Sequence, residues 1–522
     1  MSEMTDIIVV GAGHNSLTAA AYLAKHGLSV LVLERNDHIG GGVVTEELTV
    51  PGFHHDTHSI IHQYIQMNPM IDKDELGLLS KFGLKYLEAP YMFSSVFEDG
   101  SIIQMGQDLE MSCASIAVHS ERDAKAYRDF IHKTYEILPM VQHALFNPPM
   151  PFGGFMALLE QSPLGRELMG DMLGSAYDLA LKYFENEKVQ MHLLRYAAEA
   201  MMGPESKGTG LLLFITAAAL HAKNARYPEG GSGHLSLAIQ RCIEHYGGKI
   251  MLNSSVKRLI MSGDKATGVE LDDGRVFHAK KAVLASVHPK NLNDFVGGRL
   301  TPEIQADIKN LKPSDYVAFN THYALKEPLR YKVHPEALAN TFGIEIQPAN
   351  MMELRQMFDE FRYNKLPEHL SVIGCVPSNF DKKRCPEGNA VLYLYMFAPS
   401  KLVNGDWDEI KMQVADRMLE TYRQIAENLT DDNIIARHVD SPKDMAKHSA
   451  SFVGGDIMSL GMHLFQFMGR RPTPDLASYR VPGVSGLYLV GPFMHPGGGV
   501  MGGGRPVAIR VMADLGMKTD ML

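Results

Sequence analysis

The chain has 522 residues, 45% hydrophobic and 21% charged, which is typical of a globular protein and excludes a disordered or coiled-coil chain. Lysine and arginine number 50 against 60 aspartate and glutamate residues, and a net charge of −10 argues against a nucleic-acid partner. The four cysteines contain no C-x-x-C pair, so neither a thioredoxin-like dithiol nor a cysteine-based zinc site is indicated.

The first strand-like run begins at Ile7 and leaves no space for a signal or transit peptide before it. We therefore expect a cytoplasmic protein, with membrane association as an open alternative. The longest apolar stretch, residues 211–220, has about half of the roughly 20 residues that a membrane-spanning helix needs. A buried helix is the first interpretation of this stretch, and an apolar substrate channel or a face resting on a membrane is the second.

Residues 6–34 have the pattern of a dinucleotide-binding β-α-β unit. A β-branched run ends at Val10, and the turn Gly11-Ala12-Gly13 leads into a helical pattern that ends near Gly27. A second strand then leads to the acidic Glu34. Strand, glycine turn, helix, strand and acid in this order predict a dinucleotide site.

Each residue type in this unit has a physical role. Gly11 permits the tight turn, and Gly13 lets the backbone approach a pyrophosphate. The first helical residues would offer backbone amides to the same diphosphate at the positive end of the helix dipole. Glu34 would accept hydrogen bonds from the adenosine ribose hydroxyls. The remaining predicted contacts of this unit are His14, Asn15, Arg35 and Ser16, which replaces the third glycine of the fingerprint.

A second glycine turn, Gly40-Gly41-Gly42, follows Glu34 by six residues, and Thr45 and Asp56 come after it. With this stretch the sequence resembles the FAD superfamily that includes amine oxidases, Rab escort proteins and phytoene desaturases. The resemblance implies FAD as the cofactor, with Gly40, Gly41 and Gly42 near its pyrophosphate. Gly42 stands where many members have arginine.

Residues 247–286 read as a β-rich module. Strands are predicted at 256–261 and 266–271, a turn at Asp272-Asp273-Gly274, and a buried strand at 281–286. In the resembled superfamily, Val256 occupies the position whose backbone contacts the adenine.

A third patch, PFMHPGGGVMGGGR, occupies residues 492–505 and precedes a helical pattern. Such a density of glycine allows close approach to a bound group. The motif and its place near the C-terminus are characteristic of phytoene desaturase-like flavoproteins, which the sequence resembles. We expect Gly491, Gly499, Val500 and Met501 at the flavin, with the following helix N-terminus facing flavin N1 and O2.

Two histidines are candidates for a catalytic base, His495 within the glycine motif and His58 near the end of the first domain segment. A histidine that only hydrogen-bonds the backbone is the alternative for both. We predict no metal site, because the histidines of residues 54–62 share no helix face. We also predict no nicotinamide site, because a second fingerprint and a C-x-x-x-x-C motif are absent from the sequence.

The predicted fold class is α/β. It comprises a Rossmann-like FAD-binding domain of the glutathione reductase type, as in amine oxidases and phytoene desaturases, interleaved with an α+β substrate domain. The FAD-binding domain is assigned to residues 1–75, 226–300 and 476–522, and the substrate domain to 76–225 and 301–475. Helices are expected in the substrate domain at 121–146, 163–201 and 406–428, and strands at 320–325 and 393–397.

The resemblance implies an FAD-dependent oxidoreductase that takes hydride from an activated C–H bond of a small apolar or amphipathic molecule. A desaturase or dehydrogenase that forms C=C is the first hypothesis. An amine or alcohol oxidase on the same fold, a non-redox FAD-dependent isomerase and a lipid-binding chaperone are the alternatives. Oxygen, a quinone or another acceptor would take the electrons, and peripheral membrane contact and a homo-oligomer stay open.

Overall fold

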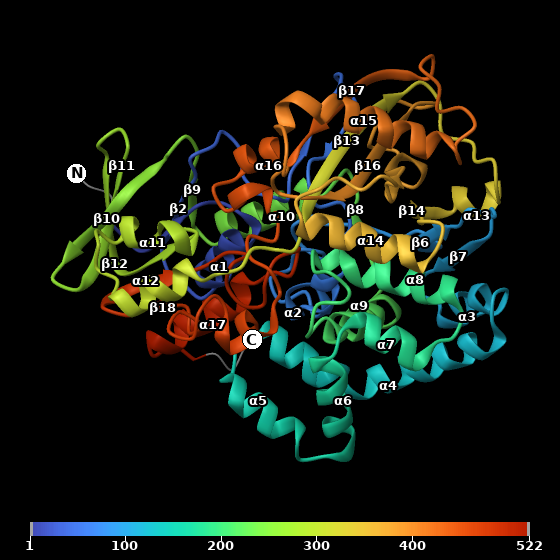
Figure 1. Ribbon diagram of the computed structural model, residues 1–522. Helices are drawn as coiled ribbons and strands as arrows, with labels where there is room; N and C mark the ends of the chain where they lie inside the picture. Colours follow the sequence, from blue (N-terminus) through green and yellow to red (C-terminus); the bar gives the residue numbers. More distant parts are fainter. Residues whose placement is uncertain (1–3, 519–522) are drawn as a thin grey trace.

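The computed structural model describes residues 4–518 and contains two large sheets with a group of helices beside them. The first sheet lies at the left of Figure 1 and the second at the upper right. The helices between residues 109 and 223 extend from the bottom centre to the right of the picture. Among the described residues, no helix combines the length and apolar character needed to cross a membrane.

The first sheet has eight strands in the order β10-β11-β19-β12-β1-β2-β9, with β18 paired to β19. Strands β1, β2, β9, β12 and β19 run parallel. The β-branched side chains at the centre of the sheet, such as Ile7, Ile8 and Val9, are completely buried. Its strands are β1 (Met4–Val10), β2 (Val30–Leu33), β9 (Lys249–Met251), β10 (Val256–Ser262), β11 (Lys265–Leu271), β12 (Val276–Ala285), β18 (Arg480–Val481) and β19 (Val484–Leu489).

Three helices far apart in the sequence belong with this sheet. Helix α1 (His14–Lys25) follows β1 and packs against both α10 (Gly233–His245) and α17 (Gly504–Asp514). Residues 14–24 of α1 are all buried, so this helix is covered on every side. The dinucleotide fingerprint is therefore held in a rigid core.

The second sheet has seven strands in the order β17-β13-β16-β15-β14-β6-β7. All nine residues of β13 and of β16 are buried, because α15 (Trp407–Arg423) covers one face and further apolar side chains cover the other. Its strands are β6 (Tyr91–Val96), β7 (Ile102–Met105), β13 (Val317–Leu325), β14 (Thr341–Ile346), β15 (Val372–Cys375), β16 (Ala390–Ala398) and β17 (Ile434–Asp440).

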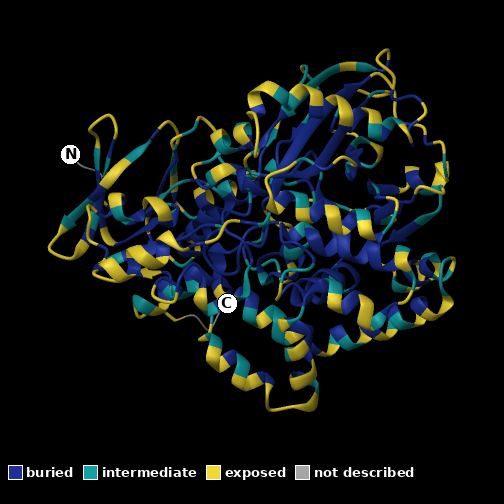
Figure 2. Cartoon of the chain, in the orientation of Figure 1, coloured by how far each residue is buried: buried dark blue, intermediate teal, exposed yellow. Residues whose placement is uncertain are grey.

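The apolar stretch at 211–220 forms the middle of α9 (Gly210–Lys223), which packs against four other helices. Residues 210–221 are all buried, as the dark core of Figure 2 illustrates, so the buried-helix interpretation is confirmed. Those four helices are α4 (Glu121–Phe146), α6 (Pro163–Leu173), α7 (Ala176–Tyr183) and α8 (Glu187–Ala197), and the same group also contains α3 (Leu109–Ala117) and α5 (Phe152–Leu159).

The helical stretch expected at 163–201 is divided into α6, α7 and α8 in the structure. The breaks come where side chains cap new helices. Ser175 forms a reciprocal capping box with Asp178, and the side chain of Asn186 accepts hydrogen bonds from two amides of the first turn of α8. These local hydrogen bonds compete with helix continuation.

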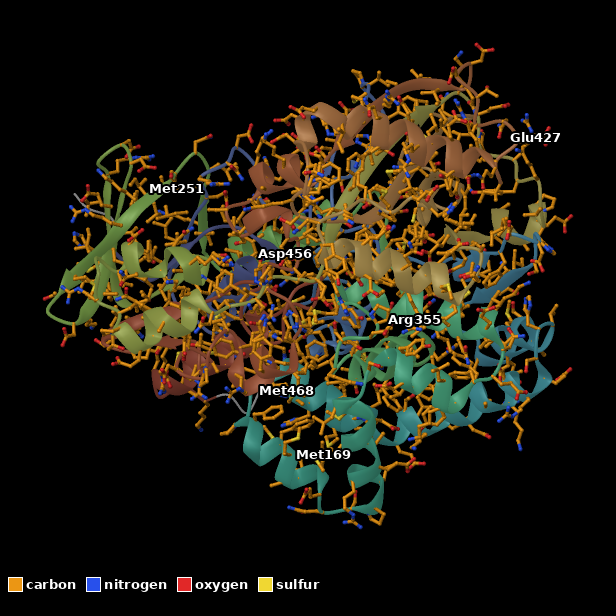
Figure 3. All side chains as sticks on the ribbon, in the orientation of Figure 1. Met169, Met251, Arg355, Glu427, Asp456 and Met468 are labelled. Carbon is orange, nitrogen blue, oxygen red and sulfur yellow. The ribbon has the colours of Figure 1, made fainter. Side chains whose placement is uncertain are left out.

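The smaller elements connect these units. Asp456, labelled near the middle of Figure 3, accepts hydrogen bonds of 2.9 Å from the amide and the hydroxyl of Ser314. The remaining strands and helices are β3 (Thr45–Glu46), β4 (His55–Asp56), β5 (Tyr86–Leu87), β8 (Tyr227–Pro228), α2 (Pro69–Asp72), α11 (Pro289–Phe295), α12 (Pro302–Lys309), α13 (Pro335–Ala339), α14 (Met351–Arg362) and α16 (Pro442–His448).

Candidate functional site

A cavity of about 490 Å³ lies between the two large sheets. One end is bounded by residues at the carboxyl ends of β1, β2 and β12, which are Val10, Leu33 and Ser286. The other end is lined by alternate residues of the second sheet, such as Tyr393 and Tyr395, which share one face of β16. The carboxyl edge of parallel strands is where open α/β sheets bind ligands.

The glycine turn after β1 brings the backbone to the cavity. Gly11 has a φ of +89°, and a Cβ there would lie 3.2 Å from the Cβ of Ser286. Gly13 is the N-cap of α1, with a φ of −64°. The first turn of α1 carries no acidic side chain and no side-chain cap. Its residues His14, Asn15 and Ser16 line the cavity at the positive end of the helix dipole.

Glu34 lies on the cavity wall at the end of β2, as predicted from the spacing. Its carboxylate accepts a hydrogen bond of 2.6 Å from the amide of Ala12 and one of 2.9 Å from the amide of Asn36. The side chain is 7% exposed. These two bonds hold the carboxylate at the mouth of the glycine turn, where a ribose would lie beside the pyrophosphate.

The second glycine turn packs directly against the first. Gly40 donates a hydrogen bond of 2.8 Å to the carbonyl of Ala12, and a Cβ on Gly41 would lie 3.1 Å from the Cα of Gly13. Gly41 and Gly42 line the cavity, whereas Gly40 lies behind them. A Cβ on Gly42 would meet the ring of Phe452 at 2.8 Å, so this ring fills the space beside the glycine.

The two glycine turns and the first turn of α1 together form a glycine cradle. Three observations show that this cradle fits a bound dinucleotide. A Cβ on Gly13 would meet no atom within 4 Å, so the space beside it is open. His14 Nε2 and Ser16 Oγ are buried on the same wall without a hydrogen-bond partner. Burial lowers the pKa of His14 to about 4, so its ring is neutral and can donate or accept a hydrogen bond. Buried polar atoms usually have partners, and a ligand would supply them here.

Most of the other predicted cofactor contacts also line the cavity. These are Asn15, Arg35, Val256, Gly491, Gly499 and Val500. Met501 does not reach the wall. Its side chain packs in an apolar cluster with Leu211 and Ile215, and its carbonyl accepts a hydrogen bond of 2.8 Å from Asn68.

The helix after the C-terminal glycine motif, α17, is in close contact with α1 at its N-terminus. The amide of Gly503 donates to Asn15 Oδ1 at 2.8 Å, and a Cβ on Gly504 would lie only 2.0 Å from the carbonyl oxygen of Asn15. The N-terminus of α17 therefore packs on the first turn of α1. Gly499 and Val500, which precede it, are the residues of this motif that face the cavity.

The two candidate bases have different surroundings. His495 is completely buried, and its Nε2 lies 2.9 Å from the carbonyl of Ala144 in α4. It is not on the cavity wall, so the prediction that it is catalytic loses its geometric basis. The position of His495 within the glycine motif did not determine the direction in which its ring points.

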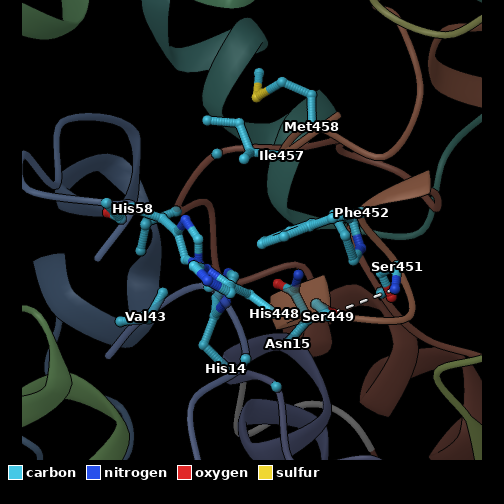
Figure 4. Close-up of a pocket in the computed structure, with 18 of the residues that line it drawn as sticks. His14, Asn15, Val43, His58, His448, Ser449, Ser451, Phe452, Ile457 and Met458 are labelled. Atoms are coloured by element: carbon cyan, nitrogen blue, oxygen red, sulfur yellow. Dashed lines mark hydrogen bonds between the residues drawn. The ribbon is translucent and has the colours of Figure 1, made fainter. Parts of the chain in front are cut away.

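His58 does lie on the wall, beside Phe452 and His448 (Figure 4). Its Nε2 is 3.1 Å from His448 Nδ1, and its Nδ1 is buried without a partner. Burial lowers the pKa of His58 to about 3, with the adjacent His448 adding to the effect, so the ring is neutral at pH 7. His448 in turn lies 3.7 Å from a carboxylate oxygen of Asp440.

Sequence reasoning missed several wall residues. His448, Phe452, Glu199 and Tyr395 reach the cavity from segments without a phosphate-binding motif. No local pattern marks them, because the strand, helices and loop that carry them meet only in the folded chain. The motif residues Thr45 and Asp56 prove structural: their side chains bond at 2.6 Å and hold the start of α10.

The chain is similar to known proteins over nearly its full length. The family model described as an NAD(P)-binding Rossmann-like domain matches residues 9–71. Pyridine nucleotide-disulfide oxidoreductase domain-containing protein 2 of Mus musculus is 30% identical, over 98% of this chain and 94% of the relative. One of the limonene dehydrogenase subunits of Castellaniella defragrans is 27% identical, with coverage of 99% and 96%. The lycopene-forming phytoene desaturase of Pantoea ananas is 24% identical, with 96% of each chain covered.

Solved structures share the fold at much lower sequence identity. A triple mutant of putrescine oxidase matches 99% of both chains with a TM-score of 0.62 and 15% identity. An oxidoreductase from Methanosarcina mazei matches 98% of this chain and 99% of its own, with a TM-score of 0.60 and 14% identity. Together with the glycine cradle and its acid, the full-length relatives identify the chain as a member of the phytoene desaturase-like family of FAD-dependent oxidoreductases.

Proposed function

We propose that the chain binds FAD and takes hydride from an activated C–H bond of a largely apolar small molecule, with C=C formation as the reaction. The observation that carries this proposal is the continuity of the cavity. One end is the glycine cradle of α1, and the other is a chamber of apolar and aromatic side chains. A substrate in the chamber would meet the reactive end of a dinucleotide held in the cradle.

The cradle residues would hold the cofactor as follows. Gly11, Gly13 and the first turn of α1 would bind the diphosphate, Glu34 the adenosine ribose, and Val256 would lie beside the adenine. FAD, when bound, supplies the hydride acceptor. The similarity to a phytoene desaturase and to a component of limonene dehydrogenase supports an apolar substrate whose C–H is allylic.

Residues of the chain would manage the substrate and the proton. Met92, Phe93, Ile373 and Met458 line the chamber and would exclude water from the reacting bond. When hydride leaves one carbon, the neighbouring carbon must lose a proton. The unpartnered Nδ1 of His58 is an acceptor on the wall, and His448 is placed to take the charge onward.

The test begins with the absorption spectrum of the purified protein, reconstituted with FAD if needed. Anaerobic mixing with an allylic cyclic terpene such as limonene should bleach the flavin band, and its saturated analogue should not. NADH and NADPH should leave the band intact over the same time. A protein that holds no FAD, bleaching by the saturated analogue, or rapid bleaching by either nucleotide would contradict the proposal.

An amine or alcohol oxidase is the second candidate, and Glu199 on the chamber wall favours it for a cationic substrate. The two candidates differ in product, C=C against C=N or C=O. Oxygen, a quinone or another acceptor would take the electrons from the reduced flavin. Oxygen consumption with substrate, compared with reduction of an added quinone, would identify the acceptor.

A further inference from the structure

A buried ion network lies behind the aromatic end of the cavity. Arg195, on α8, has no exposed surface, and its guanidinium stacks on the ring of Phe397 at 3.7 Å from the ring centre. It pairs with the fully buried Glu345 on β14 and, at 2.5 Å, with Glu199 just after α8. Of the three charged side chains, Glu199 is the one that is accessible, with 32% of its side chain exposed.

The network has more negative than positive groups. Two carboxylates share one guanidinium, and within residues 4–518 Arg195 is the cationic side chain paired with Glu199. Burial raises the pKa of Glu345 to about 7, and the nearby charge of Glu199 adds to that shift. When Glu345 is ionised, the network carries a net charge of −1 beside a cavity of low polarity.

Apart from Arg195 and Glu345, the groups that face Glu199 from the surrounding elements are aromatic or neutral. The ionisable side chains whose pKa values respond to its charge, besides the network itself, are Tyr64, Tyr196, Tyr316, Cys375, Tyr393 and Tyr395. The hydroxyl of Tyr395 donates to Glu199 Oε2 at 3.4 Å. Glu199, Tyr64, Tyr196, Tyr393 and Tyr395 all line the cavity. A cation beside Glu199 would be attracted both by the charge of the carboxylate and by the π faces of the aromatic rings around it.

We propose that this end of the cavity is a subsite for a protonated amine, whose ammonium group pairs with Glu199 while its apolar part lies along the chamber. The cation would balance the second carboxylate of the network. This inference rests on the proposed function, since it assigns the substrate class of the same cavity. It concerns where the polar end of the substrate binds and is independent of which bond is oxidised.

The test is calorimetric titration of the purified holoenzyme with hexylammonium chloride and with 1-hexanol at pH 8. The two probes have the same apolar chain and differ in the charge of the head group. A charge-assisted hydrogen bond contributes about 1.5–3 kcal/mol, so hexylammonium should bind roughly ten- to a hundredfold more tightly. Equal affinities, or tighter binding of the alcohol, would overturn the proposal without any variant being needed.

Variants then assign the preference to one side chain. Glu199→Gln should reduce the affinity for hexylammonium by about tenfold or more and leave that for 1-hexanol unchanged. Glu199→Asp should retain most of the preference. Glu205→Gln is the matched control. Glu205 is similarly exposed, at 33%, but pairs with Arg355, labelled in Figure 3, and is not among the residues that line the cavity.

The outcomes separate this inference from the proposed function. Calorimetry reports binding whether or not the flavin is reduced, so a protein that selects the ammonium but bleaches with no substrate supports the subsite and contradicts the redox proposal. A yellow protein that oxidises a terpene but binds hexylammonium no more tightly than 1-hexanol supports the redox proposal and contradicts the subsite. If Glu199→Gln and Glu205→Gln both keep the full preference, the carboxylate of Glu199 does not bind the cation.

Discussion

A methyl group added at Gly13 should weaken cofactor binding without weakening the fold. Its φ of −64° suits alanine, and no atom lies within 4 Å of the Cβ position. Gly13→Ala should therefore leave the melting temperature of the FAD-free protein within a degree or two, or raise it slightly. The same methyl group would occupy the space for the pyrophosphate and lower the affinity for FAD. Thermal melting of the FAD-free protein and fluorescence titration with FAD measure both effects, and unchanged affinity would refute the placement of the diphosphate.

Glu34 provides the charge of the cradle. Replacing Glu34 with alanine removes an acceptor for the ribose and also the bonds to the amides of Ala12 and Asn36. The affinity for FAD should fall about ten- to a hundredfold, as expected for a charge-assisted hydrogen bond. Glu244→Ala, on the exposed side of α10, is the control and should bind FAD normally. Retention of FAD by Glu34→Ala through prolonged dialysis would contradict the assignment.

At the scale of elements, the contact between α1 and α17 depends on a residue without a side chain. A Cβ on Gly504 would lie 2.0 Å from Asn15 O and 2.5 Å from Ala19 N, which are backbone atoms that cannot rotate away. Gly504→Ala should force the two helices apart and lower the free energy of unfolding by about 1–3 kcal/mol. The resulting shift of α1 should also weaken FAD binding.

The control for this prediction is another helical glycine. Gly170 is exposed on α6, and its Cβ position meets nothing within 4 Å. Gly170→Ala should be neutral or stabilise the protein by up to about 1 kcal/mol through helix propensity. Chemical denaturation of both variants compares them directly. Equal stability of the two would mean that the helices are not in close contact.

Elements differ in how far the sequence predicts them. The β-α-β unit of β1, α1 and β2 was predicted because its turn, helix and acid are specified by local chemistry. The strands expected at 320–325 and 393–397 lie inside β13 and β16, where apolar runs are buried on both faces. The stretch expected to be helical at 163–201 is helical but is divided into α6, α7 and α8, with breaks at Gly174-Ser175 and Asn186, which the sequence shows as a C-terminal glycine and N-caps.

The residues of the candidate site also differ in how far the sequence predicts them. The residues predicted to contact a cofactor through the backbone follow from glycine spacing, and most of them line the cavity. Residues that act through side chains do not follow, because ring direction depends on distant contacts. His495 bonds to Ala144 of α4, 351 residues earlier in the chain. Glu199 carries no motif. Arg195 lies four residues before it in the chain, but Glu345 is brought to this pair only by the tertiary fold.

At the scale of the whole molecule, buried histidines make the fold sensitive to acid. Burial lowers the pKa to about 3 or 4 for His14, His55, His58, His62, His192, His221, His288 and His495. The unfolded chain binds protons at these groups below its ordinary histidine pKa of about 6.5, whereas the folded chain stays neutral. The contribution of these neutral histidines to the free energy of unfolding should therefore be complete above pH 6.5 and be lost as the pH falls towards 4.

Three groups have the opposite sign and cannot compensate, and one of them is Asp456, whose pKa is raised by burial. The pKa of Glu345 is raised to about 7, so its contribution to stability is largest in acid and is lost as the pH rises from about 4.5 to 7. The pKa of His438 is raised by the carboxylate of Asp440. The eight histidines with lowered pKa values outweigh these three groups. Melting temperatures at pH 7.5, 6.5, 5.5 and 4.5 should fall steeply below pH 6.5, and a constant or rising value would contradict the burial of the histidines.

The position of β19 has a consequence for how the protein is made. This strand, Val484–Leu489, lies between β11 and β12 inside the first sheet, although it is synthesised more than 450 residues after β1. A ribosome therefore releases the glycine fingerprint long before the strand that completes its sheet exists. During translation the early strands must wait with an incomplete sheet, where a chaperone has time to bind them. A nonsense mutation ahead of Val484 would remove this inner strand and so disrupt the part of the protein that was translated first.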